Sequence, residues 1–371
     1  MKTRKVLLSA VLATLLAPLP ALAGNTSTVN GVSITLPTAA EFEKATGIKP
    51  LEKPLNIRAC IFDPIGNNGP GIQYAKDLVL QAKRWNVFLD IKVYTDERVA
   101  AEDFKANQCD AVAISTFRAK QFNKFIGSLD SVGSLQDYAQ VRTAMNVLYT
   151  NPKVAPLMID GPYQVGGVVP IGAIYVMVND RSINSIEKAA GKKVAVLEFD
   201  KSQAKMVQQL GAQPVSSDIT NFSGKFNNGQ VDIIAAPAIV FRPRELYRGL
   251  GDKGGIYRIP LANMTASVVI RREKFLKEVP DFDDKIQKIR GFVIGYLDQA
   301  YALIDSVEKD IPERYWMDLS PEDKDKYFRM MREARLQLTA DGTYDPRMMA
   351  LLKKVRCKHN PTNFECSLKD E

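Results

Sequence analysis

Histidine is nearly absent from this 371-residue chain: the single one, His359, lies close to its end. Nucleophilic sites of the Ser/His/Asp and Cys/His kinds need a histidine, so such an active site is not expected in the body of the chain. Carboxylate-pair chemistry needs none, but no recognisable pairing supports it. Lysine and arginine clusters with interleaved aromatic residues are also missing, which argues against nucleic-acid binding despite a formal charge of +8. Composition therefore predicts no enzyme and no nucleic-acid partner.

Long apolar runs are missing as well, except at the amino terminus. Met1–Lys5 is basic, Val6–Leu19 is apolar but shorter than the roughly 18 residues of a membrane helix, and Ala21–Ala23 suits signal peptidase. This pattern predicts a secretory signal peptide over residues 1–23, cleavage after Ala23 and a periplasmic location. Gly24 follows instead of a cysteine, so no lipid anchor is expected.

Cysteines are few and even in number: Cys60, Cys109, Cys357 and Cys366. In an oxidising compartment this favours two disulfides. Cys357 and Cys366 are neighbours in the tail, and Cys60 and Cys109 then pair by elimination, unless their predicted strands hold them too far apart. A metal site of Cys357, His359 and Cys366 is the alternative in the tail. We prefer the disulfide and expect neither a metal nor a cofactor.

The first half of the chain alternates strands and helices. Strands are predicted at 55–62, 88–94 and 110–115, with amphipathic helices at 70–85 and 97–107 between them. Short turns and right-handed crossovers imply a parallel sheet with helices on its faces. This is an α/β lobe.

The same alternation returns later in the chain. Strands are predicted at 172–178, 193–197, 213–215 and 231–235, and helices at 182–190, 201–210 and 221–226. A strand at 266–270 is expected to return the chain to the first lobe, followed by a long helix over 281–301 and a helix start at Ser320.

We therefore expect two open, mainly parallel sheets joined by crossover segments near 164–171 and near Met264, with a helical C-terminal extension. The predicted divisions are a signal peptide (1–23), the first part of lobe 1 (24–168), lobe 2 (169–263), the return to lobe 1 with a connecting helix (264–300) and the extension (301–371).

Three short motifs carry a resemblance to a known family. They are Gly191-Lys192-Lys193-Val194, Gly211-Ala212-Gln213-Pro214-Val215 and Gly229-Gln230-Val231-Asp232. Their order and spacing resemble the "GxKxxV", "GAxPV" and "GxVD" strands in the second lobe of solute-binding proteins of TRAP transporters, and the likeness extends over roughly residues 55–300. Among these the chain most resembles the AdeT-type group, part of which is linked to aminoglycoside efflux. The resemblance implies a type II periplasmic binding protein-like fold.

The chain departs from the TRAP pattern where ligands bind. Family members commonly carry an arginine that clamps a ligand carboxylate in the "GxKxRV" strand, but this chain has Ala195 there. Family members also usually have a polar residue just before the proline that follows the "GxVD" strand. In this chain the residue before Pro237 is Ala236. Either the ligand differs, or another arginine such as Arg118 or Arg242 supplies the charge.

In open α/β sheets, ligands bind at loops that follow the carboxyl ends of strands. Four loops meet this condition: 63–71, 115–120, 198–202 and 236–242. The candidate ligand-binding residues within and near them are Asp63, Asn67, Ser115, Thr116, Arg118, Tyr175, Glu198, Phe199, Pro237 and Arg242.

Each candidate also has a purely structural interpretation. Asp63 and Asn67 suit a turn, Arg118 a surface position, and Tyr175 and Phe199 core packing. Acids at 198 and 200 suit an amine ligand, or a helix cap in the case of Asp200. The glycine-rich loop 66–71 does not have dinucleotide-binding spacing, and an amide nest for an anion is its remaining alternative.

Three functions follow from this. The first is a monomeric solute receptor that closes over a small molecule by a hinge motion and delivers it to a membrane transporter. The second is a periplasmic accessory of an efflux system, bound to an efflux subunit. An enzyme on the same fold is a distant third.

Overall fold

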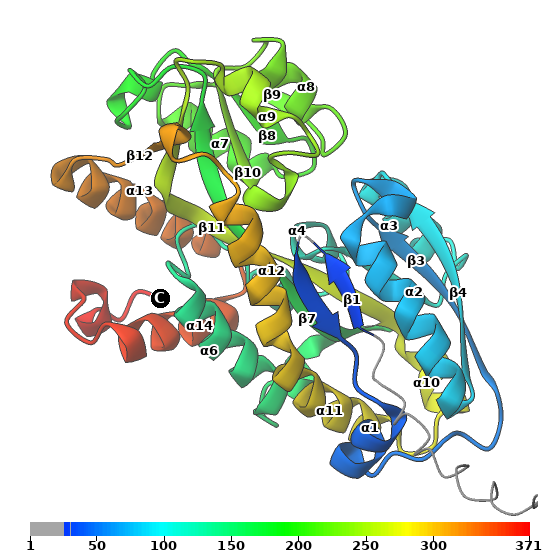
Figure 1. Ribbon diagram of the computed structural model, residues 1–371. Coiled ribbons are helices and arrows are strands. Elements are labelled where there is room, and N and C mark those ends of the chain that lie inside the picture. The colour runs from blue at the N-terminus through cyan, green and yellow to red at the C-terminus, as the bar shows by residue number, and fades with distance from the viewer. Residues whose placement is uncertain (1–25, 30) are drawn as a thin grey trace, which may run out of the picture.

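The computed structural model describes residues 26–29 and 31–371, so the predicted signal peptide lies outside the described residues. Figure 1 shows two lobes joined by long strands and by helix α12, with the C-terminal helices α13 and α14 against one side. Within the described part of the chain, no helix combines the length and apolarity needed to cross a membrane.

The first lobe follows the predicted alternation. Strands β3 (Leu55–Phe62), β4 (Val87–Tyr94) and β5 (Ala111–Ser115) lie in parallel in the order β4-β3-β5. Helices α2 (Pro70–Ala82) and α3 (Glu97–Lys105) connect them, and Asp96 caps α3 by accepting the N–H of Arg98 at 2.8 Å. The predicted parallel sheet is confirmed.

The second lobe is built in the same way. Strands β8 (Lys193–Leu197), β9 (Gln213–Ser217) and β10 (Ile233–Pro237) are connected by α7 (Lys201–Gln209) and α8 (Phe222–Asn227). One prediction here was wrong. The helix expected over 182–190 is only the 3-10 turn η4 (Glu187–Ala189), because Asp180 and Ser185 bond to nearby backbone N–H groups and favour turns.

Two long strands carry the chain between the lobes. β7 (Tyr163–Val178) and β11 (Gly255–Arg271) pair antiparallel along most of their length. They stand at the centre of a ten-stranded sheet, in which eight strands follow the order β4-β3-β5-β11-β7-β10-β8-β9 and the short strands β12 and β6 pair with β11 and β7. The crossovers predicted near 164–171 and near Met264 lie within these two strands. The predicted lobe boundaries at 168 and 263 also fall inside them, and the division of the chain at these two positions stays a prediction.

Helices α11 and α12, which follow the return to the first lobe, pack against strand β7. The predicted helix 281–301 is interrupted and runs further, as α11 (Phe282–Val293), the turn η6 (Ile294–Tyr296) and α12 (Leu297–Lys309). The remaining helices and strands are β1 (Thr26–Val29), β2 (Val32–Thr35), α1 (Ala39–Thr46), α4 (Thr116–Ala119), α5 (Lys124–Gly127), α6 (Tyr138–Thr150), β6 (Ile159–Asp160), α9 (Leu246–Leu250), α10 (Arg272–Glu278) and β12 (Trp316–Met317).

The C-terminal extension contacts both lobes. Its first helix is α13 (Pro321–Ala340), capped by Ser320 as predicted, and α14 (Pro346–His359) follows. On the side of the second lobe, Gln337 accepts from Gln209 and Asp341 pairs with Lys205, both at 2.8 Å. On the side of the first lobe, the guanidinium of Arg335 donates to the carbonyl of Val132 at 3.2 Å.

A buried ion cluster closes the end of the extension. Arg335 and Arg356 lie among Glu365 and Glu371, with a side-chain separation of 2.8 Å between Arg356 Nε and Glu365 Oε1 and between Arg335 Nε and Glu371 Oε1. All four side chains are almost fully buried. Each charge is therefore matched by an opposite one, as burial of charges requires.

Both predicted disulfides are present. Cys357 pairs with Cys366, and Cys60 with Cys109. Cys109 precedes β5, which runs beside β3, and the Cα atoms of Cys60 and Cys109 are 5.8 Å apart. The parallel strands thus keep this pair within bonding range.

Candidate ligand-binding cavity

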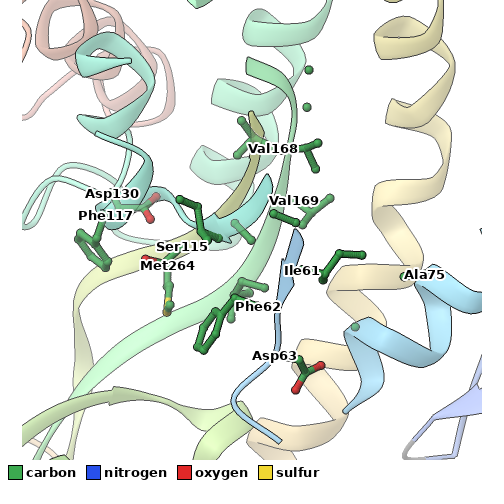
Figure 2. Close-up of a pocket in the computed structure, with 18 of the residues that line it drawn as sticks. Ile61, Phe62, Asp63, Ala75, Ser115, Phe117, Asp130, Val168, Val169 and Met264 are labelled. Carbon is green, nitrogen blue, oxygen red and sulfur yellow. The ribbon is translucent and has the colours of Figure 1, made fainter. Parts of the chain in front are cut away.

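A cavity of about 990 Å³ lies at the strand ends of both lobes. All four loops predicted at strand ends contribute to its lining or lie at its edge. Figure 2 shows Phe62 and Ile61 pointing in opposite directions from the end of β3, and both line the cavity, which therefore has lining residues on either side of this strand. We call the part beside Phe62, Phe117 and Met264 the cleft arm, and the part beside Ile61, Ala75 and Val169 the groove arm.

Asp63, Ser115 and Pro237 are the predicted site residues that line the cavity. Ser115 begins α4: its hydroxyl accepts the N–H of Arg118 at 3.2 Å, and its own N–H donates to Glu97 at 3.1 Å. Both polar groups are thus used within the protein. Pro237 ends β10 and brings the second lobe to the cleft arm.

Asp63 serves chiefly as a turn residue. Its carboxylate accepts the N–H of Ile65 at 2.9 Å and lies at the start of α2, where a Cβ on Gly69 would come within 1.9 Å of it. Burial raises the pKa of Asp63, and the N–H groups of Ile65, Ile72 and Gly71 offset part of that effect. The amide nest considered for an anionic ligand is therefore occupied by a carboxylate of the chain itself.

Arg118 spans the space between the lobes. Its guanidinium carbon lies 3.6 Å from the ring centroid of Phe199, which follows β8 in the other lobe. On its inner side, Arg118 Nε is 3.5 Å from a carboxylate oxygen of buried Glu97, and neither atom has a hydrogen-bond partner among the described residues. Burial raises the pKa of Glu97, although the hydrogen bonds from Ser115 and the charge of Arg118 partly offset this increase. Arg118 and Phe199 thus contact each other rather than line the cavity.

A chain of hydroxyls leads from the cavity into the protein. Thr116 is fully buried, and its Oγ1 lies 2.7 Å from the hydroxyls of both Thr265 and Ser267. Asp130, at the cavity wall, accepts the N–H and the hydroxyl of Thr265, both at 2.8 Å. Burial raises the pKa of Asp130 to about 7. Sequence reasoning missed Asp130 because it follows no strand.

A partly buried lysine lies near the carboxylates of Asp130 and Asp200, which line the cavity. Lys120 Nζ lies 4.9 Å from the ring centroid of Tyr344, a residue of the C-terminal extension that also lines the cavity. Burial lowers the pKa of Lys120, while the nearby charges of Asp200 and Asp130 raise it. Sequence reasoning had placed Lys120 only at the end of a candidate loop and gave it no role.

Besides Thr116, Arg118 and Phe199, four further predicted site residues do not line the cavity. Tyr175 is buried behind the sheet, where its ring packs edge-on to Trp316 and its hydroxyl donates to Glu308 at 3.1 Å. Arg242 forms an exposed ion pair with Asp310, so it supplies no charge to the cleft. Asn67 and Glu198 are exposed and do not line the cavity.

Comparison with known proteins agrees with this arrangement. A family model described as "Solute-binding protein AdeT 1/2" matches residues 83–371. The chain is 49% identical over 313 residues to "Probable solute-binding protein AdeT1" of Acinetobacter baumannii, which covers 84% of this chain and 100% of that protein. The chain belongs to the AdeT 1/2 family of solute-binding proteins. A second relative in the same organism, "Probable solute-binding protein AdeT2", is 25% identical over 243 residues, covering 66% of this chain and 99% of its own.

Solved structures share the fold of this AdeT-family chain. A TRAP periplasmic solute-binding protein from Desulfovibrio salexigens, with bound orotic acid, matches with a TM-score of 0.66 and 14% identity, over 82% of this chain and 99% of its own. One from Shewanella oneidensis, with bound succinate, matches with a TM-score of 0.62 and 13% identity, over 81% and 99%. The two-lobed α/β fold is thereby confirmed, and the proteins it matches are periplasmic solute-binding proteins rather than enzymes.

The two departures from the TRAP pattern lie at different places in this AdeT-family chain. Ala195 lines the cavity, so a methyl group stands there. Ala236 is buried in the core of the second lobe.

Proposed function

We propose that the protein captures a small molecule in the cleft arm by closure of its two lobes and delivers it to a membrane transporter. The observation that carries this proposal is the cavity between strand-end loops of both lobes, which binding proteins of this architecture use for their ligands. Its lining requires a ligand with a largely apolar surface, because Phe62, Phe117 and Met264 face it and Ala195 offers no charge.

The connecting strands supply a place for the hinge. Gly172 in β7 has φ of 134°, which glycine alone adopts readily, and it pairs with Met264 next to a register shift in β11. An irregular ladder transmits less stiffness than a regular one, so the lobes can rotate there. Helix α12 packs against this point, because a Cβ on Gly172 would lie 3.4 Å from Ile304.

Closure is supported by contacts that only approaching lobes can make. Besides Arg118 and Phe199, the guanidinium of Arg244 in the second lobe donates to the carbonyl of Pro64 in the first at 2.8 Å. These contacts lie beside the cavity, where ligand binding and lobe contact reinforce one another.

The remaining parts of the proposal concern location and partners. We propose cleavage after Ala23, a monomeric protein in the periplasm and a role without catalysis. The only histidine, His359, bonds to Thr143 in the helical layer, and no cluster of potential metal ligands occurs among the described residues. The cleaved terminus is checked by sequencing the exported protein.

Mass spectrometry of small molecules released from gently denatured protein tests the central proposal. We expect a stoichiometric compound whose readdition lowers the radius of gyration in solution scattering and raises the melting temperature. Protein carrying Phe117→Asp is expected to release none. If wild-type preparations release nothing and a broad ligand library leaves both measurements unchanged, the proposal fails. An efflux accessory would instead be retained by a pump subunit without binding any small molecule.

A further inference from the structure

The groove arm is an open apolar channel on the first lobe. Its floor is the sheet, through Val169 and Val268, and its walls are α2 and α11, through Leu78 and Ile289. These four residues are 37–39% exposed, although a sheet face between two helices is normally buried. The helices lie too far apart to cover the strands between them.

The floor of the groove offers a ligand no backbone partners. Strand β11 is paired on both sides, with β5 and β7. Strand β10 pairs with β7 only from Ile174 onward, but on the edge of β7 before that point the N–H and C=O of Val168 bond to the hydroxyl of Tyr149, and Arg290 donates to the carbonyl of Gly166. An extended peptide in this channel would therefore bury its own N–H and C=O groups without hydrogen bonds, at a considerable cost. A hydrocarbon chain has no such groups.

The charged side chains along the groove arm give the ligand a direction. At the end next to the cleft, Asp63 is already held by backbone N–H groups. At the other end, Lys49 and Lys285 line the cavity from the loop after α1 and from α11, two helices that contact each other. Lys49 is exposed and makes no ion pair with the residues that the structure describes. This end is suited to an anionic head group.

We propose that the groove arm binds a long-chain carboxylate, with its acyl chain along the sheet and its carboxylate at Lys49 and Lys285. The inference rests on the proposed function, since it names a ligand class for the same continuous cavity. At about 990 Å³, the cavity lies at the upper end of the roughly 300–1,000 Å³ typical of small-molecule sites. A chain of this kind also buries the apolar groove floor.

Two leucines on α2 provide a matched pair of variants. Leu78 lines the groove arm, whereas Leu80 is 58% exposed and does not line the cavity. Both positions are partly open to solvent, so an aspartate at either one is tolerated by the fold. Leu78→Asp is expected to weaken binding of hexadecanoate at least tenfold in a fluorescent fatty-acid displacement assay, and Leu80→Asp less than twofold.

Chain length and head group provide the second measurement. From octanoate to dodecanoate, affinity is expected to rise about fourfold for each added methylene. Lys49→Gln combined with Lys285→Gln is expected to weaken hexadecanoate but not hexadecanol. If the two lysines had only a structural role, the double variant would change the affinities for hexadecanoate and hexadecanol by the same factor.

Three outcomes would overturn the inference: no binding of hexadecanoate by the wild-type protein, equal binding by the two leucine variants, or a concentration-dependent dimer that Leu78→Asp disrupts in the absence of acyl binding. Occupation of the groove by residues 1–23 in the uncleaved chain, with no acyl binding after cleavage, would also overturn it. In each case, a released solute and closure that depend on Phe117 would leave the proposed function intact. Loss of both would end the two proposals together.

Discussion

The guanidinium carbon of Arg118 lies 3.6 Å from the ring centroid of Phe199, and the two residues belong to different lobes. The arginine side chain is only 11% exposed and is backed by Glu97. A cation held over an aromatic face in such surroundings contributes about 1–2 kcal/mol. Because the contact breaks when the lobes separate, its energy favours the closed arrangement directly.

Phe199→Ala is therefore expected to shift the ratio of closed to open molecules about 5- to 30-fold toward the open form. Solution scattering measures this as a larger radius of gyration without ligand. Phe364→Ala is the control, because Phe364 also lies beside arginines, Arg329 and Arg332, but within the extension. An unchanged radius in the Phe199 variant would remove the contact from the closure mechanism.

Asp130 is expected to make stability fall as pH rises. Its pKa is about 7 in the folded protein, above that of an exposed aspartate near 4, so the folded state holds the proton longer. Between about pH 4 and pH 7 the unfolded state alone ionises, which lowers the free energy of unfolding by roughly 2–4 kcal/mol. Chemical denaturation of Asp130→Asn is expected to lack this decline, while Asp90→Asn, at an exposed position, retains it.

Arg242 is expected to have no part in ligand capture, because its guanidinium is held by Asp310 on the surface. Arg242→Ala should change the affinity for the released ligand less than twofold and cost at most about 1 kcal/mol of stability. Phe117→Ala removes an aromatic wall of the cleft arm and should weaken binding at least tenfold, as calorimetry would show. Equal losses in both variants would mean that Arg242 reaches the ligand after all.

Glu365 is expected to have the opposite effect to Asp130, so that its contribution to stability is lost as pH falls. Burial alone would raise its pKa, but the hydrogen bond and charge of Arg356, with Arg335 beside it, hold the pKa below its usual range. Its contribution is present above the unfolded pKa, near 4, and is lost as pH falls through the lower folded value. Glu365→Gln leaves the buried arginines short of one partner and should cost about 3–5 kcal/mol at pH 7.

Thermal unfolding at pH 7 and pH 4 measures this loss. The control is Glu322→Gln, since Glu322 pairs with Lys326 in the open and should change stability by less than about 1 kcal/mol. A Glu365 variant as stable as its parent at pH 7 would show that the cluster is not held by charge.

The sequence predicted the strands and the loops well, because both depend on local patterns. The ends of β3 and β8 agree with the predicted strands, and Ser115 and Pro237 reach the cavity as strand-end residues should. Tyr175 was misplaced because both faces of β7 are apolar. Its neighbour Ile174 faces the cavity, and alternation then turns Tyr175 the other way.

Contacts between distant residues were beyond a single sequence. Arg242 is held away from the cleft by its ion pair with Asp310, which lies 68 residues later in the chain. Asp130 accepts a hydrogen bond from Thr265, which is 135 residues away. No sequence motif predicts that Asp310 or Thr265 makes these contacts. The groove arm escaped notice for a related reason, since it depends on the spacing of α2 and α11 rather than on any residue pattern.

Helix α13 touches the second lobe through Gln209 and Lys205 and the first through Val132. All of these bonds come from residues 335–341, at the carboxyl end of the helix, so one short segment bridges the two lobes. Full separation of the lobes would break the bonds on one side or the other. We therefore expect the extension to limit how far the binding site can open.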